Sequence, residues 1–277
     1  MLAVANGGGL HPARNIVGGD FIQLVRLGIR AANDPIVRDS LAVMDRVLKV
    51  ELPQGPGWYR YNHDGYGQKN DGSAFDGTGV GRPWPLLTGE RGHYELANGS
   101  DPKSFITTME GFANEGGMIS EQLWDAADQP KKELWRGQPT GAAMPLCWSH
   151  AEYLSLVRSA NDRVCFDRVE PAYQRYVVDV VKHVHEMWSH HHSIRCMSAG
   201  HMLRLIIAAD ASIFWSADDW ASTNQTNAIP LAALNLWFAD LPTEACPEGT
   251  VIQFAFSWKA NQRDKDGNYS VTVRAPK

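Results

Sequence analysis

The sequence predicts a mainly α-helical region followed by a small antiparallel β domain. Two observations support this fold class. Apolar residues recur at helical spacing in several segments before residue 165. From about Arg195 the period becomes two, as in strands with one buried face. We therefore expect a helical portion over 1–165, an extended connector over 166–194 and a β-sandwich module over 195–277.

Composition excludes several classes of function. The chain has 277 residues and a net charge of −5, without blocks of basic residues that would indicate nucleic-acid binding. The sequence contains no run of 18 apolar residues, so no membrane span is predicted. Four dispersed cysteines form no CxxC pair, and the run 190–192 of three histidines is interpreted as a solvated turn. No metal and no cofactor are expected.

Five helices are expected in the first region. They cover residues 20–32, 36–50, 83–98, a segment that begins near 100, and a segment from after 145 to about 161. The third helix carries Gly89 and Gly92, which cost about 1 kcal/mol each in a helix interior. We interpret them as the site of a close helix–helix contact with a buried Glu90/Arg91 pair, rather than assigning Glu90 a catalytic role.

Two loops carry the chemically informative residues. The loop over 53–82 is long, yet it is rich in aromatic residues, which predicts an ordered loop that forms a site. The second stretch, 116–125, places Glu121 and Gln122 directly before Leu123 and Trp124. A carboxylate beside an aromatic ring can act as a base toward a water molecule near a sugar. The alternative is a solvated glutamate beside a core tryptophan.

The β domain is indicated by alternating apolar residues in three segments, which are Leu203–Ile207, Ile252–Trp258 and Tyr269–Val273. A hairpin turn is expected at 265–268. Trp215 and Trp220 could form a platform for sugars, but we expect them to be buried in the core.

Several segments, in order along the chain, resemble glycoside hydrolase family 15, the bacterial glucoamylases and glucodextranases. They are Asp20–Arg30, Trp58–Gly67, Trp84–Leu96, Ser120–Gln122 and Trp148–Ala151, and the stretch Phe214–Trp220 looks like the β module that follows the catalytic barrel in some members. Each motif alone is weak, whereas five in family order are specific.

The resemblance implies a partial (α/α)6 barrel and inverting release of glucose from the non-reducing ends of α-glucans. Inversion uses two carboxyl groups roughly 6.5 to 9.5 Å apart, an acid and a base. By the same resemblance Glu121 is the general base, and a base must hold a water molecule, so we expect this side chain to be partly exposed and free of a salt bridge to lysine or arginine. The substrate-binding residues that it implies are Arg60, Asp64, Trp84 and Trp148.

The family's general acid lies in an earlier barrel loop, and only about five of twelve barrel helices are expected here. We therefore expect a chain that begins inside an inter-helix loop and lacks the acid, with Glu90 and Asp64 as the nearest internal candidates. Its substrate would be an α-glucan or a maltooligosaccharide. Its protein partner would be a complementing N-terminal segment, or a second copy of the chain bound through exposed helix faces. The alternative function is a non-catalytic carbohydrate-binding or vestigial remnant.

Overall fold

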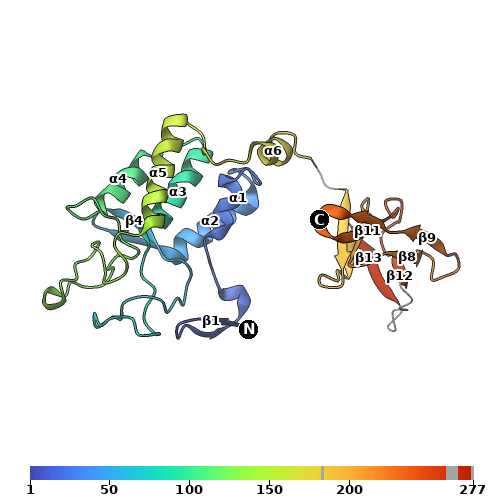
Figure 1. Ribbon diagram of the computed structural model, residues 1–277, viewed down its shortest axis with the longest axis horizontal. Coiled ribbons are helices and arrows are strands. Elements are labelled where there is room, and N and C mark those ends of the chain that lie inside the picture. Colours follow the sequence, from blue (N-terminus) through green and yellow to red (C-terminus); the bar gives the residue numbers. More distant parts are fainter. Residues whose placement is uncertain (182–183, 260–267, 276–277) are drawn as a thin grey trace. The chain divides into compact units, whose positions relative to one another are not determined.

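The chain forms two compact units, Met1–Val181 and Lys182–Lys277. The computed structural model describes residues 1–181, 184–259 and 268–275 (Figure 1). The boundary between the two units falls inside the stretch 166–194. This stretch was expected to be an extended connector, but it contains helical turns and a strand. Helix α6 and a π-helical turn precede the boundary, and the first strand of the second unit follows it; their bounds are Glu170–Tyr173, Gln174–Val178 and, for β5, His185–Ser189.

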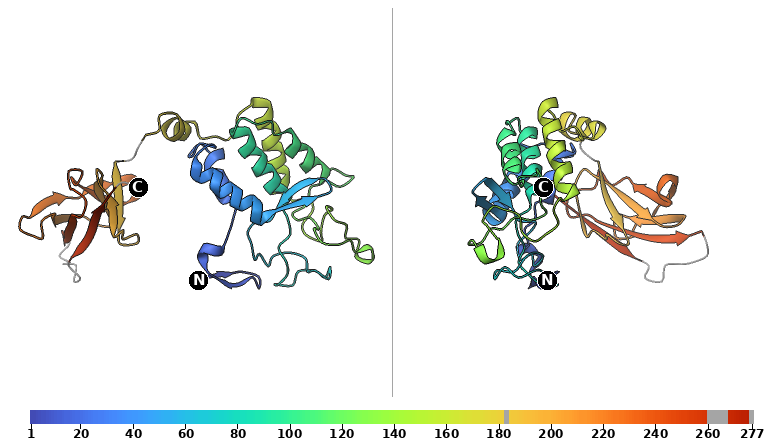
Figure 2. Two further views of the ribbon diagram at one scale, coloured as in Figure 1. Left: turned by 180° about the vertical axis from the view of Figure 1, so that it is seen from behind. Right: turned by 60° about the vertical axis from the view of Figure 1, so that its left-hand side comes forward.

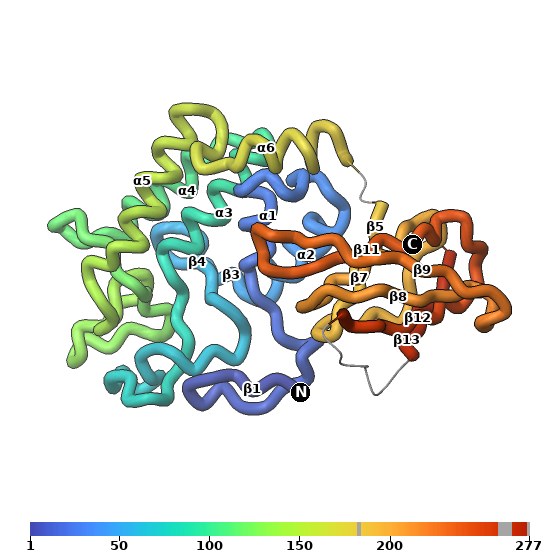
Figure 3. Tube along the Cα trace, turned by 45° about the vertical axis from the view of Figure 1, so that its right-hand side comes forward, coloured from blue at the N-terminus to red at the C-terminus, as the bar shows by residue number. Residues whose placement is uncertain are grey.

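The first unit contains helices, two small hairpins and long loops. Its helices are α1 (Gln23–Arg26), α2 (Pro35–Leu48), α3 (Pro85–Ala97), α4 (Lys103–Gly111), α5 (Cys147–Asp162) and α6. Its hairpins pair β1 (Leu2–Val4) with β2 (Gly9–His11) and β3 (Lys49–Leu52) with β4 (Gly55–Trp58). Helices α3, α4 and α5 pack together, and β4 lies beside α3 (Figure 3).

The first expected helix, 20–32, is much shorter in the structure. A 3-10 turn over Asp20–Ile22 leads into α1, which ends at Arg26. Gly28 adopts φ +81°, its N–H donates to Val25 O, and the N–H of Ile29 donates to Leu24 O at 2.8 Å. This pattern of bonds is the Schellman motif, which ends a helix at a glycine. A side chain at position 28 would also meet Tyr173 of α6.

The two glycines of α3 allow the close helix contact that the sequence predicts. A Cβ atom at Gly89 would lie 2.6 Å from Glu152 Cγ on α5, and one at Gly92 would lie 2.8 Å from Leu156 Cδ2. The predicted pairing of Glu90 with Arg91 is wrong. Arg91 instead pairs with Glu95 and, at 3.2 Å, with Asp45, because these carboxylates lie on its side of the helix.

The second unit is a sandwich of two sheets. One has the strand order β10-β11-β7-β5 and the other β6-β13-β12-β8-β9. Besides β5, the bounds are β6 (Cys196–Ser198), β7 (Met202–Ile207), β8 (Ala211–Ser216), β9 (Asn224–Asn227), β10 (Ile229–Leu231), β11 (Leu236–Leu241), β12 (Val251–Trp258) and β13 (Tyr269–Arg274). Most neighbouring strands pair in antiparallel fashion, as predicted. Two pairs are parallel, β5 with β7 and β6 with β13.

A single apolar cluster fills this sandwich, with Phe254 and Leu205 fully buried and Trp215 6% exposed. Trp215 therefore belongs to the core, as expected, whereas Trp220 is only half-buried. Most of the turn expected at 265–268 lies outside the described residues. The description "mainly α" is too broad, because the α-helices among the described residues are confined to the first unit, where long loops separate them.

Candidate functional site

Three extended segments of the first unit lie side by side. The N–H of Trp84 donates to Trp58 O at 3.0 Å, and the N–H of Leu123 donates to Pro83 O at 2.9 Å. Arg60, two residues after Trp58, and Glu121, two residues before Leu123, are therefore brought to the same region. The loops over 59–84 and 113–146 extend from one end of the packed helices (Figures 1 and 2).

Arg60 is held at the centre of a group of aromatic rings. Its Nε and Nη2 donate to the two carboxylate oxygens of Asp64 at 2.8 and 2.9 Å. The guanidinium carbon lies 4.9 Å from the ring centroids of both Tyr66 and Trp84. The ring of Trp148 is 6.3 Å from that of Trp84. Four of the predicted site residues therefore form one cluster. The ring of Tyr66, which was not among the predicted site residues, completes this cluster.

This cluster borders a cavity of the first unit that is about 570 Å³ in volume. Arg60, Trp84 and Trp148 line it, together with Glu90 and Glu152. Trp148 is 57% exposed, so its ring is available at the surface. Ring faces next to charged and hydrogen-bonding groups suit a hydroxylated ligand with an apolar face.

Glu121 lies next to this cluster but does not line the cavity. Its N–H donates to Ala143 O at 2.9 Å, and the side chain contacts Tyr66. Burial, the charge of Glu121 and a hydrogen bond to it raise the pKa of the Tyr66 phenol. We expected Glu121 to be partly exposed, but it is only 7% exposed, because neighbouring loop segments cover it. No lysine or arginine of the described residues forms an ion pair with it.

The first turn of α5 fixes the two residues before Glu121. The hydroxyl of Ser149 donates to Ser120 O at 3.0 Å, and the N–H of Ile119 donates to His150 Nε2 at 3.0 Å. This ring nitrogen is an acceptor here, so it carries no proton. The motif Trp148–Ala151 predicts a role for its tryptophan but none for Ser149 or His150.

A second polar group, which the sequence does not predict, connects the long loop to the segment that carries Glu121. Arg82, 2% exposed, donates from Nη1 to Asp125 Oδ1 at 2.7 Å and from Nε to Gln68 O at 2.9 Å. The Tyr59 hydroxyl donates to the other oxygen of Asp125. Burial and this carboxylate raise the pKa of Tyr59. The loop over 53–82, which was expected to be ordered, is thus held by hydrogen bonds at several points.

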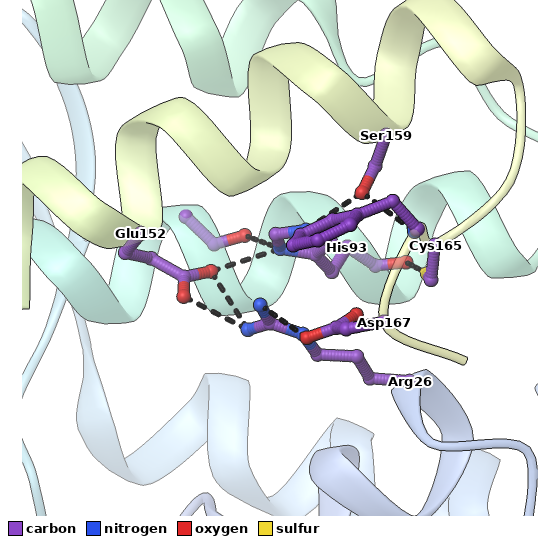
Figure 4. Close-up of polar contacts among 8 residues, drawn as sticks. Arg26, His93, Glu152, Ser159, Cys165 and Asp167 are labelled. Carbon is purple, nitrogen blue, oxygen red and sulfur yellow. Dashed lines mark hydrogen bonds and ion pairs between the residues drawn. The ribbon is translucent and has the colours of Figure 1, made fainter. Parts of the chain in front are cut away.

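Glu90 has an unusual environment. It is half-buried on the cavity wall, and burial, followed by repulsion from the Glu152 carboxylate, raises its pKa to about 7. Glu152 has two polar partners, Arg26 and His93. It accepts from Arg26 Nη1 at 2.8 Å and lies 2.8 Å from His93 Nδ1, while Arg26 Nη2 is 2.9 Å from Asp167 (Figure 4). The network in Figure 4 joins α1, α3, α5 and the segment after α5.

Neither a metal centre nor a membrane span is found in the described part of the chain. No group of three or more His, Cys, Asp or Glu side chains there could hold a metal ion. No described helix combines the length and apolar character needed to cross a membrane. The expected His190–His192 turn follows β5, with Ser189 N–H donating to His192 O.

The loops of this helical unit thus gather an Arg–Asp pair, aromatic rings and a buried glutamate, an arrangement that suits the binding of a hydroxylated ligand with an apolar face. The chain belongs to glycosyl hydrolases family 15, whose family profile matches residues 7–158. It is 47% identical over 176 residues to a glucoamylase of Clostridium sp. (strain G0005), covering 64% of this chain and 24% of that protein.

Among solved structures, it resembles the crystal structure of a bacterial glucoamylase complexed with acarbose. The TM-score is 0.60 at 47% identity, over 64% of this chain and 25% of that chain. The fold is therefore glucoamylase-like, with helices and sheets, and the chain spans about a quarter of the length of these relatives.

Proposed function

We propose that this chain carries the base-bearing part of a glucoamylase-type site that releases glucose from the non-reducing ends of α-glucans with inversion. In this proposal Glu121 is the general base, and the substrate-binding residues are Arg60, Asp64, Trp84 and Trp148. The observation that carries it is the position of Glu121 directly beside the ring cluster around Arg60. The likeness to a glucoamylase that was crystallised with acarbose supports an oligosaccharide as the substrate.

The proposed chemistry follows from the partners of each group. Glu121 has no basic partner in the described part of the chain, so its carboxylate remains free to accept a proton from water. The Tyr66 hydroxyl can hold that carboxylate in one orientation. Asp64 keeps the Arg60 guanidinium in a fixed plane, from which remaining N–H groups can donate to sugar hydroxyls.

Inversion also needs an acid across the cleft. Asp64 is engaged by both nitrogens of Arg60, and Glu152 is engaged by Arg26 and His93, so neither is suited to deliver a proton. Glu90 carries a raised pKa, but it lies within α3, whereas Glu121 and Arg60 lie in the loops. We propose that the acid comes from residues outside these 277. The packed helices of the first unit would then be an arc of an (α/α)6 barrel, with the second unit as an accessory β module.

The test compares glucose release by three proteins. The 277-residue chain alone should not hydrolyse maltose or starch. The same chain joined to the part of the Clostridium glucoamylase outside the matched segment should, and Glu121→Gln in that longer chain should lower the rate by roughly 10² to 10⁴. Activity of the short chain that Glu90→Gln abolishes would show that Glu90 is the acid.

A second candidate function is non-catalytic binding of carbohydrate. It is favoured by the 7% exposure of Glu121 and by its absence from the cavity wall. Saturable binding of maltooligosaccharides without hydrolysis by the longer chain, unchanged by Glu121→Gln, would support this candidate over the enzyme.

A further inference from the structure

The two sheets of the second unit present outer faces of different character. Directly paired residues of neighbouring strands lie on the same face of a sheet, so the register assigns each outward side chain. On the sheet β6-β13-β12-β8-β9 most outward side chains are small or polar, among them Ser212, Gln225, Gln253, Ser257, Ser270 and Thr272. On the sheet β10-β11-β7-β5 the outward side chains include six that we call the apolar face: Met187, Ile206, Ile229, Leu231, Leu236 and Phe238.

The apolar face is continuous across three strands. Ile206 of β7, Phe238 of β11 and Ile229 of β10 form one row, and Leu236 opposite Leu231 forms the next. Ile229 is 55% exposed, and the other four residues are half-buried. Outward positions of a sandwich are normally polar because they face water, and a contiguous exposed apolar patch marks a binding surface.

One ion pair lies beside these rows on the same face. Arg204 donates from Nε and Nη2 to the two carboxylate oxygens of Asp240 at 2.6 and 2.7 Å, and His185 Nε2 lies 3.5 Å from that carboxylate. The guanidinium carbon of Arg204 is 4.6 Å from the ring centroid of Phe238, so this ring already holds a cation and is not an open platform for a sugar. The opposite charges of the pair cancel, so the face does not favour a partner of one charge sign, such as a nucleic acid.

We propose that the apolar face binds the same face of a second copy of this chain around a two-fold axis. An identical surface supplies apolar rows opposite apolar rows, and a two-fold axis can bring Arg204 of each copy toward Asp240 of the other, so that opposite charges meet. Packing of sheet on sheet is also how the two sheets of the sandwich bury their inner faces. This contact lies in the second unit and does not depend on the proposed hydrolysis.

The size of the face determines the strength of this contact. Four strands about 4.8 Å apart, with about five residues each, give roughly 19 Å by 17 Å, or about 320 Å² of projected area. Stable interfaces bury about 800 Å² per partner. The contact therefore belongs to the weak, reversible class, and we expect a dissociation constant between about 1 μM and about 1 mM.

The experiment is sedimentation of the full 277-residue chain over a concentration series that spans this range. We expect a reversible equilibrium between monomer and dimer. Ile229→Glu places a charge in the apolar row and should raise the dissociation constant about tenfold or more. Met187→Glu, at a 55% exposed position on the opposite edge strand β5, should weaken the dimer in the same direction. Both positions are exposed, so the fold should tolerate the substitutions, and thermal unfolding checks this.

The matched control is Phe214→Glu, the same kind of change at an exposed outward position of the other sheet, and it should leave the dissociation constant unchanged. Leu154→Glu, at a 64% exposed position of α5, tests association through the first unit and should also have no effect. A chain that stays monomeric at every concentration would overturn the proposal. So would equal association of the wild-type chain and the Ile229→Glu and Met187→Glu variants, or loss of the dimer in either control.

Discussion

The two units of this chain are stabilised in different ways. The sandwich has one continuous apolar core, whereas the first unit has three small apolar clusters among the described residues and several buried polar networks between them. Arg82, Glu152 and His93 are nearly inaccessible to solvent, yet each is bonded. Buried charges cost free energy unless they are paired, so the stability of the first unit depends on these polar partners. The proposed active site lies in that unit.

The largest effect is expected from a substitution that disrupts the apolar core of the sandwich. Phe254→Ala removes a fully buried ring and should lower the free energy of unfolding of the second unit by about 3–5 kcal/mol, leaving the first unit unchanged. The matched control is Phe214→Ala, at an exposed position on the adjacent strand β8, with an expected cost of about 0.5 kcal/mol. Urea unfolding followed by circular dichroism measures both, and equal costs would contradict the single-core description.

The second effect concerns the network of Figure 4. Glu152→Leu leaves Arg26 and His93 buried without their shared carboxylate, and the first unit should lose roughly 3 kcal/mol. Glu170→Gln, which removes an exposed partner of Arg168, should cost less than about 0.5 kcal/mol. If Glu152→Leu proves neutral in urea unfolding, the network does not hold the helices together.

The third effect is a pH dependence at Glu90. Its pKa of about 7 in the folded chain exceeds the ordinary value of 4.5, so the unfolded carboxyl ionises first as the pH rises. The contribution of Glu90 to stability is therefore complete below pH 4.5 and is lost as the pH approaches 7. Relative to Glu90→Gln, the wild-type first unit should lose roughly 3 kcal/mol across this window. Urea titrations at several pH values test this, and a constant difference would contradict it.

The smallest effect concerns the α5 contact behind Glu121. His150→Leu removes the acceptor of the Ile119 N–H and should cost about 1–2 kcal/mol, while His150→Gln can keep an acceptor and should cost less. Hydrogen exchange of the Ile119 amide should accelerate in the leucine variant alone. Equal exchange in both variants would show that the imidazole does not fix this segment.

Local patterns were sufficient for several elements. The positions of α2, α3 and α5 and of strands β7, β12 and β13 follow from apolar periodicity within a few residues. The predicted extent of the first helix was wrong because the amphipathic pattern continues past Gly28, whereas the Schellman motif at that glycine ends the helix. The predicted ion pair between Glu90 and Arg91 is not formed, because adjacent residues on a helix point in different directions.

The sequence by itself determined which residue types gather in the two site-forming loops, and the family motifs pointed to Glu121, Arg60, Asp64, Trp84 and Trp148. Only the tertiary structure decided that Tyr66 joins Glu121 to the ring cluster, that Ser149 and His150 fix the backbone before it, and that Ile206, Phe238 and Ile229 share one outer face of a sheet. These contacts join segments tens of residues apart. Local periodicity carries no information about such pairings, because they depend on how the helices and loops pack together in space.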